Sequence, residues 1–389
     1  EGTLSFKQAP KWLALAYGSD VEGYQWLFSG QDVSANLATG SDANAIGFAL
    51  DHLDFGLAIH KAVEPGDDRS WISLSAQADS AGLFGLEDYG LTLAGTSIAV
   101  DINVARGTDA NGQANSSVIN WQDPHMGPIS WSNGITLDLD HEVVSVSGIM
   151  AIGFSDVLNA TGYLSITRQE MDLRVGDQDM AASGWIVGAQ ALNGNVYGLS
   201  LTNMDMAMAM MRAADASSSD TRSWLALKAN VDQLTVDGAE FGLVDGLQVD
   251  ISALSLEMNQ AFGKRAGVQN TTVADWTGER SISVSAPVSA QDGSENTPVV
   301  LDFSSEFGEQ LAVSLEADVT LGDSLAMAGA FALTRTGARG VYMDDGTRRR
   351  MQVSTLAASG LTVYAGSDVA NRAQPGWAGM VIDNAQVGI

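Results

Sequence analysis

The residues best suited to acid–base or metal chemistry in this sequence are its histidines. They number four, at His52, His60, His125 and His141. Their spacing matches no metal-binding pattern, and the chain has no G-x-S-x-G elbow, phosphate-binding loop or H-E-x-x-H motif. None of the histidines recurs at an equivalent place in the internal repeat described below, where His52 aligns with Asn203 and Asn384 at what we expect to be a polar strand end. The sequence therefore predicts a protein that is not an enzyme.

Clustered carboxylates form a second group that could do chemistry. Loop carboxylates are hard oxygen ligands of the kind that calcium prefers, and a bound cation would offset negative self-repulsion. The first pair of such acids is Asp67 and Asp68, which follow Glu64. A second pair, Asp215 and Asp220, stands at the equivalent place in the next repeat unit. The candidate calcium ligands are Asp67, Asp68, Asp215, Asp220, Asp344 and Asp345. Simple solvation of these loops is the alternative, and no other cofactor is predicted.

A recurrent Arg-Ser-Trp sequence contains the aromatic residues of greatest interest. Trp71 and Trp224 could stack on sugars, as aromatic side chains do in carbohydrate binders. Each stands at the start of an alternating strand, where tryptophan usually fills a core. We therefore predict core packing, with Arg69 and Arg222 paired to the aspartates that precede them. We also predict that the alternating methionines 204, 206, 208 and 210 pack in a core rather than bind a cofactor.

The charge balance narrows the classes of partner. The chain has 47 acidic and 19 basic residues, which gives a net charge of -28. Such a surface repels the phosphates of nucleic acid and the anionic face of most membranes. There is no cysteine, and no apolar run approaches the roughly 18 residues of a membrane span. The sequence predicts an extracellular or cell-surface protein without nucleic-acid binding or membrane insertion.

An internal repeat dominates the sequence. Arg69, Phe84, Ile102 and Val118 begin short motifs that return at offsets of 153, 157, 156 and 155 residues, by subtraction of residue numbers. Three further landmarks occur three times in the same order. They are the segments starting at 2, 162 and 329, the glycine-closed segments 27–30, 185–188 and 363–366, and the segments 47–52, 198–203 and 379–384. The repeat predicts unit 1 at 1–160, unit 2 at 161–327 and a partial unit 3 at 328–389, each cut from a longer array.

Period-two alternation over runs bounded by Gly, Asp and Asn predicts strands throughout each unit. The predicted fold class is all-β, with tandem units of about 155 to 165 residues that form an elongated twisted sheet or solenoid-like rod. A series of β-sandwiches is the alternative. We favour the continuous form because no proline-rich linker separates the two full units.

These landmarks resemble the tandem repeats of giant secreted or surface-associated bacterial proteins, which are adhesin-like or close to hemolysin-type calcium-binding sequences. The segments that carry the resemblance are 69–74, 90–103, 118–121, 363–366 and 379–382. The resemblance implies a structural or adhesive role and brings no catalytic residues. The calcium-binding nonapeptide G-G-x-G-x-D is missing here, so the resemblance does not imply calcium binding.

The sequence therefore predicts an extracellular structural protein whose β-rich units stack and self-associate into a filament, sheath or surface layer. Its partners would be other copies of itself or adjacent repeats of a longer chain. The principal alternative is an adhesin stalk or binding module that contacts glycans or cells. A polysaccharide-acting enzyme on a β-helix is a third class, which the scarcity of Lys and Arg disfavours.

Overall fold

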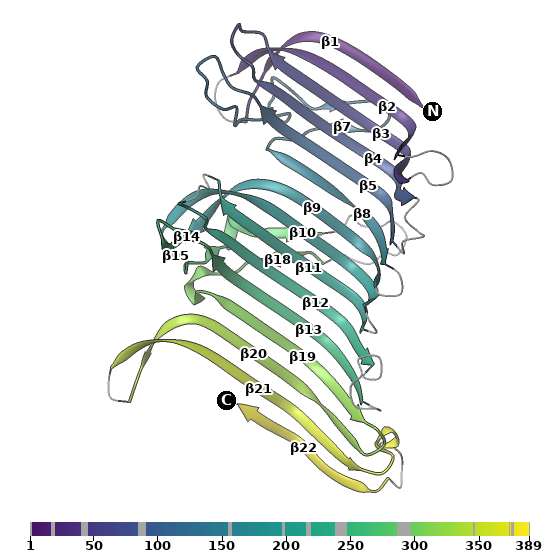
Figure 1. Ribbon diagram of the computed structural model, residues 1–389, viewed down its shortest axis with the longest axis vertical. Coiled ribbons are helices and arrows are strands. Elements are labelled where there is room, and N and C mark those ends of the chain that lie inside the picture. The colour runs from purple at the N-terminus through teal and green to yellow at the C-terminus, as the bar shows by residue number, and fades with distance from the viewer. Residues whose placement is uncertain are drawn as a thin grey trace. The chain divides into compact units, whose positions relative to one another are not determined.

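The computed structural model is all-β, as the sequence predicts (Figure 1). It describes residues 2–16, 20–39, 46–84, 91–154, 158–196, 199–214, 219–237, 247–285, 297–344, 347–372, 374 and 377–388. The helical segments in these ranges are single turns of 3-10 helix at Gly278–Arg280, Ser305–Phe307 and Val369–Asn371. The chain divides into two compact units: Glu1–Ser155 with Leu164–Glu170, and Asp156–Tyr163 with Met171–Ile389. The predicted repeat boundaries at 160 and 327 are a separate division by sequence, and they stay a prediction.

The first compact unit is built on one open antiparallel sheet. Its strands follow one another in chain order: β1 (Thr3–Leu13), β2 (Val21–Thr39), β3 (Ile46–Ala62), β4 (Ser70–Phe84), β5 (Leu91–Arg106) and β8 (Val143–Phe154). The long connection 107–142, called flap 1 below, contains the short pair β6 (Ile129–Ser130) and β7 (Thr136–Leu137). Because every neighbouring pair is antiparallel, short turns suffice to connect most strands.

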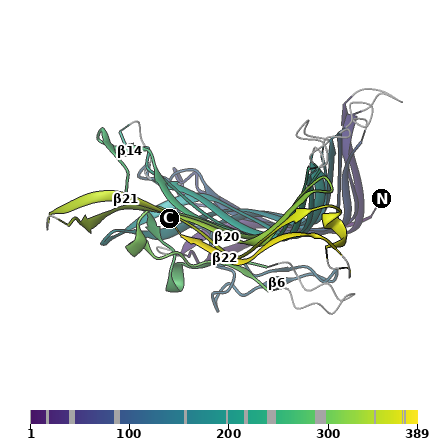
Figure 2. The ribbon, with the colours of Figure 1, turned by 90° about the horizontal axis from the view of Figure 1, so that it is seen from below.

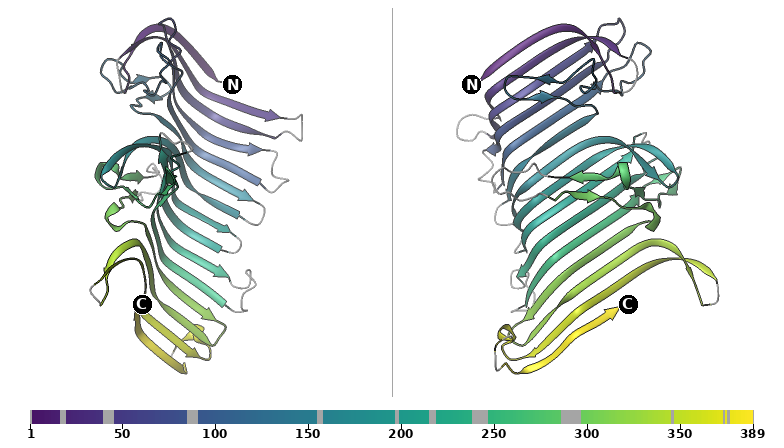
Figure 3. Two further views of the ribbon diagram at one scale, coloured as in Figure 1. Left: turned by 60° about the vertical axis from the view of Figure 1, so that its left-hand side comes forward. Right: turned by 180° about the vertical axis from the view of Figure 1, so that it is seen from behind.

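The second compact unit repeats this plan and extends it. The strand order is β9 (Leu158–Val175), β10 (Gln178–Val196), β11 (Leu199–Ala213), β12 (Ser223–Asp237), β13 (Leu247–Phe262), β19 (Gln310–Leu321), β20 (Leu325–Tyr342), β21 (Arg348–Gly366) and β22 (Gly379–Gly388). The two ends of β9 belong to this unit, and its middle, Leu164–Glu170, belongs to the first. Flap 2 (263–309) contains β14 (Lys264–Arg265), β15 (Val268–Gln269), β16 (Ala274–Asp275), β17 (Ile282–Val284) and β18 (Val299–Leu301) (Figure 3). Within each unit the strands form one sheet, as predicted, and not the alternative sandwich.

Each flap covers one face of its own sheet and makes a core there. In the first unit Trp71 and Trp121 are buried with Leu13, Ile119 and Leu137. In the second, Trp224 and Trp276 are buried against an alanine-rich sheet face. The small alanines leave room for the flap's indole rings, and truncation of such buried aromatics typically costs about 3–5 kcal/mol.

A row of β-bulges crosses the strands at recurrent positions. His52, Asn203 and Asn384 occupy equivalent places in β3, β11 and β22, each with a φ of 52 or 53°. Our prediction of a strand end at these positions is therefore wrong, because they lie inside long strands. Asparagine and histidine tolerate this left-handed conformation better than most residues, and a bulge re-aims a strand. The strands bend in the views of Figure 2.

A second set of bulges shows that one predicted landmark of the sequence repeat is misaligned in its third occurrence. Asp32, Ala191 and Gly360 have φ values of 54, 49 and 60° in β2, β10 and β21. On the preceding strand Gly2, Gly162 and Gly329 each approach the backbone that follows this bulge so closely that a Cβ would lie 3.0 Å or less from it. Segment 363–366 lies beyond its bulge, whereas segments 27–30 and 185–188 precede theirs, so the third occurrence is not equivalent.

Candidate functional site

The Arg-Ser-Trp motif anchors each flap to its sheet. Arg69 Nη2 donates to Asp67 Oδ2 at 2.6 Å, and its Nε donates to Asp67 Oδ1 at 3.0 Å. The same guanidinium lies 5.8 Å from the centre of the Trp71 ring. The Trp71 indole N–H donates to the Ser117 carbonyl in flap 1 at 2.8 Å. These contacts confirm the predicted core packing and the predicted Arg–Asp pair, and they exclude Trp71 as an exposed sugar platform.

The second unit repeats this anchor atom for atom. Arg222 Nη2 donates to Asp220 Oδ2 at 2.7 Å, and the guanidinium lies 5.8 Å from the Trp224 ring. The Trp224 indole donates to the Thr272 carbonyl in flap 2 at 3.0 Å. Hydrogen bonds from Arg222 lower the pKa of Asp220 to about 2, and those from Arg69 lower the pKa of Asp67. Both carboxylates are thus charged and paired at neutral pH.

A buried polar relay joins a second tryptophan to each sheet. In unit 1 the Trp121 indole donates to Ser73, Ser73 donates to the Asn103 side-chain oxygen, and Asn103 donates to the Ile119 carbonyl. In unit 2 alanine replaces the serine, and the Trp276 indole donates directly to Asn259 Oδ1 at 3.2 Å. Asn259 then donates to the Ala274 carbonyl at 3.1 Å. The relay satisfies polar groups that the flap buries, which is a structural role.

The six predicted calcium ligands belong to three separate loops of the sequence, at 67–68, 215–220 and 344–345. Asp67 is buried and Asp68 is exposed, while Asp220 lies in the second anchor and Asp344 is exposed. Asp215 and Asp345 lie outside the described residues. Among the residues described, no three His, Asp or Glu side chains converge as metal ligands would. The Arg-paired carboxylates have oxygens already engaged, so calcium would have to compete with a guanidinium there.

The histidines lie in different surroundings. Three of them contact a neighbouring carboxylate: His52 with Asp32 at 2.5 Å, His125 with Asp123 at 3.1 Å and His141 with Asp140 at 2.6 Å. The hydrogen bond to Asp32 raises the pKa of His52, whose side chain is exposed. The fourth, His60, is completely buried beside the Trp121 ring, with 5.6 Å between ring centres. His60 is the chemically unusual member of the group.

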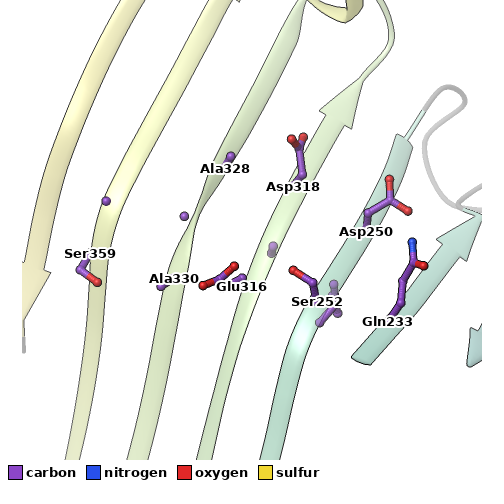
Figure 4. Close-up of a pocket in the computed structure, with 12 residues that line it drawn as sticks. Gln233, Asp250, Ser252, Glu316, Asp318, Ala328, Ala330 and Ser359 are labelled. Carbon is purple, nitrogen blue, oxygen red and sulfur yellow. The ribbon is translucent and has the colours of Figure 1, made fainter. Parts of the chain in front are cut away.

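The sheet of the second unit contains a groove. It has a volume of about 610 Å³ and runs across β12, β13, β19, β20 and β21 at the row of bulges. Figure 4 shows Asp250, Glu316 and Asp318 projecting from adjacent strands beside Gln233 and Ser252. Alanines and glycines form much of the remaining lining.

The charged side chains in this groove are carboxylates, which accept hydrogen bonds. Asp318 accepts from Arg372 at 2.8 Å, and Asp250 accepts from Thr235 at 3.0 Å. The twelve lining residues include no histidine, lysine or tyrosine that could act as a proton-transfer partner to these acids. The arrangement suits contact with cations or hydroxyl groups.

Sequence reasoning did not find this groove or the buried imidazole of His60. The groove is lined by residues of five strands, and its three carboxylates come from two of them, β13 and β19, so no local motif encodes it. A signal for His60 was present, since the repeat places it where the second unit has Met211, a fully apolar residue. A histidine at a position that is otherwise apolar indicates burial.

Among the described residues there is no helix long and apolar enough to cross a bilayer. No protein-family model matches the chain, and a search of curated proteins finds no match.

Proposed function

We propose that this chain is an extracellular structural protein that associates with copies of itself, or with adjacent repeats of a longer chain, through its open β-sheets. The observation that supports the proposal is the exposed surface. The chain has 21867 Å² of accessible surface at a mass of 40.7 kDa. A compact monomer of that mass exposes roughly 14,600 Å². The chain thus exposes about half as much surface again as a compact monomer, and this surface is available for contacts with other copies.

Two sheet edges support the same conclusion. Among the described residues β1 pairs with β2 alone, and β22 pairs with β21 alone. Large apolar side chains are exposed on both strands, including Phe6 at 60% and Met380 at 63%. An uncovered edge with apolar side chains is a template for a further strand. That strand would belong to another copy or to the next repeat, which gives assembly a route without catalysis.

Calcium fits this proposal as a stiffening ion, not as a catalytic one. Exposed carboxylates such as Asp68 and Asp344 supply oxygen ligands, and a cation would reduce repulsion between copies that each have a net charge of -28. A glycan-binding adhesin is the second candidate function. It is favoured by the exposed indole of Trp12, which lines a pocket of about 370 Å³ with Glu22 and Glu64.

Electron microscopy of the purified chain, with and without a calcium chelator, tests the proposal. Regular filaments or sheets with an axial repeat of one or two units are expected, and their loss on chelation would support the calcium role. Isolated particles under both conditions would overturn self-assembly. Glycan binding that Trp12→Ala abolishes without unfolding would then favour the adhesin.

A further inference from the structure

The face of the second sheet that flap 2 leaves uncovered is apolar, and the alternation of β11 shows why. Ala207 and Ala209 are buried under the flap, while Met208 is half-exposed and Met210 is 43% exposed on the opposite side. Our prediction that these methionines pack in a core is therefore wrong for the chain by itself. A strand with apolar residues on both faces is typical of a sheet that is covered on both sides.

Strand register extends this methionine face into two continuous rows, which we call the open stripe. One row is Ala189, Met206, Ala229, Leu256, Val313, Leu333 and Leu356, each directly opposite the next. The other is Val187, Met208, Leu227, Met258 and Leu311. The rows cross seven neighbouring strands of one compact unit. Ala189 and Ala229 are buried, Leu333 and Leu356 are 41% and 47% exposed, and the other side chains of the two rows are partly exposed.

The open stripe as listed has no ionisable side chain, although the chain as a whole is strongly acidic; the second row ends at Arg335, which lies opposite Leu311 on β20. Two copies could therefore approach through this surface without placing like charges in the middle of the contact. An anionic membrane is a poor alternative for a chain with a net charge of -28. Methionine is also well suited to a surface that must fit a second irregular surface.

The exposed surface of the chain is large enough to form an interface with a second copy. The excess over a compact monomer is about 7,300 Å². Obligate homodimer interfaces bury about 2,000–5,000 Å² in total, which is about 1,000–2,500 Å² per copy, so a face-to-face contact accounts for up to about a third of that excess. Sheet faces stack about 10 Å apart with interdigitated side chains, and a two-fold axis brings identical rows together.

We propose that the open stripe packs against the open stripe of a second copy, so that two single-layered sheets form one two-layered β-sandwich. This inference rests on the proposed self-association and names the surface that mediates it. The first unit has a similar row, Phe6, Phe28, Leu57, Leu74, Ile102 and Val144, opposite flap 1.

Analytical ultracentrifugation over about a hundredfold range of concentration tests the proposal with a matched pair of variants. Leu333→Glu places a charge in the open stripe, and Thr334→Glu adds the same charge to the next residue of β20, which is exposed on the opposite face. We expect Leu333→Glu to raise the dissociation constant tenfold or more, and Thr334→Glu to leave it within about threefold of the wild-type value. Circular dichroism melts establish that both variants stay folded.

A second measurement uses the absence of cysteine. A nitroxide on Leu333→Cys should show dipolar coupling between copies, and one on Glu279→Cys, in the exposed 3-10 turn of flap 2, should show much weaker coupling. Wild-type assembly that Leu333→Glu leaves intact, or equal coupling at both sites, would overturn the open stripe while self-association stands. A wild-type monomer would overturn both proposals. A monomer that binds neutral phosphatidylcholine vesicles through Leu333 would assign the stripe to lipid instead.

Discussion

Acid is expected to weaken the first unit through His60. The imidazole is fully buried, and neither ring nitrogen has a hydrogen-bond partner among the described residues. Burial, and secondarily the charge of Lys11, lower the pKa of His60 to about 3. The Lys11 ammonium donates to the Met126 carbonyl at 3.1 Å, so it is held in flap 1 near the ring. The folded protein therefore keeps this imidazole neutral at pH values where an exposed histidine is charged.

Proton linkage gives the sign and the size of the change that His60 makes to the free energy of unfolding as the pH falls. An unfolded chain protonates this histidine near pH 6.5, whereas the folded chain does so near pH 3. Between these values the unfolded state binds more protons, so the free energy of unfolding falls as the pH falls. The slope is at most about 1.4 kcal/mol per pH unit. Between pH 7 and pH 5 the loss is about 2 kcal/mol, and above pH 6.5 the contribution is fully retained.

Urea unfolding at pH 7 and pH 5, followed by tryptophan fluorescence, measures this loss in matched variants. His60 lies opposite Trp71, and Met211 lies opposite Trp224 at the equivalent place in unit 2. His60→Met should remove about 2 kcal/mol of acid sensitivity, and Met211→His should add a similar sensitivity to the second unit. NMR should show that the His60 imidazole stays neutral at pH 5. An equal loss in the wild type and His60→Met, or a His60 pKa near 6.5, would refute the reasoning.

Three further predictions concern the anchors, each measured by urea unfolding at neutral pH. Arg69→Ala leaves the buried Asp67 carboxylate without its charged partner and should lower the free energy of unfolding by about 2 kcal/mol, whereas Arg69→Lys should lower it less. Asn259→Ala removes the acceptor of the Trp276 indole and should cost about 2 kcal/mol; no loss would mean that water replaces the relay. Gly263 has a φ of 80° and its added Cβ would meet the Thr221 carbonyl, so Gly263→Ala should cost at least about 2 kcal/mol.

The sequence was sufficient to predict the fold class and the Arg-Ser-Trp anchors. Period-two alternation is a local property, so strands could be recognised without knowledge of their partners. The anchors could be recognised because Asp67, Arg69 and Trp71 lie within five residues and return together as Asp220, Arg222 and Trp224. A pairing that close in sequence does not depend on how distant strands meet.

The bulges and the groove could not be predicted for the opposite reason. A bulge at His52 or Asn203 is defined by the register of three neighbouring strands and by a positive φ that histidine and asparagine only tolerate. The methionine face was placed in a core because its alternation shows that one side is apolar but does not show which side the flap covers. The alanines of the other face, which alternation also predicts to share one side, were the better indication of a close-packed layer.

The two units preserve backbone geometry more closely than buried side chains. Gly107 and Gly263 both have φ near 80°, and each would place a Cβ against the carbonyl of the loop that precedes the Arg-Ser-Trp motif. Around that fixed frame, Ser73 is replaced by Ala226 and His60 by Met211, and the flap still docks. A flap that is held by backbone carbonyls and one indole N–H tolerates such exchanges. Among the described residues no flap covers the other face of the second sheet, and the proposal of a second copy on its apolar rows rests on that observation.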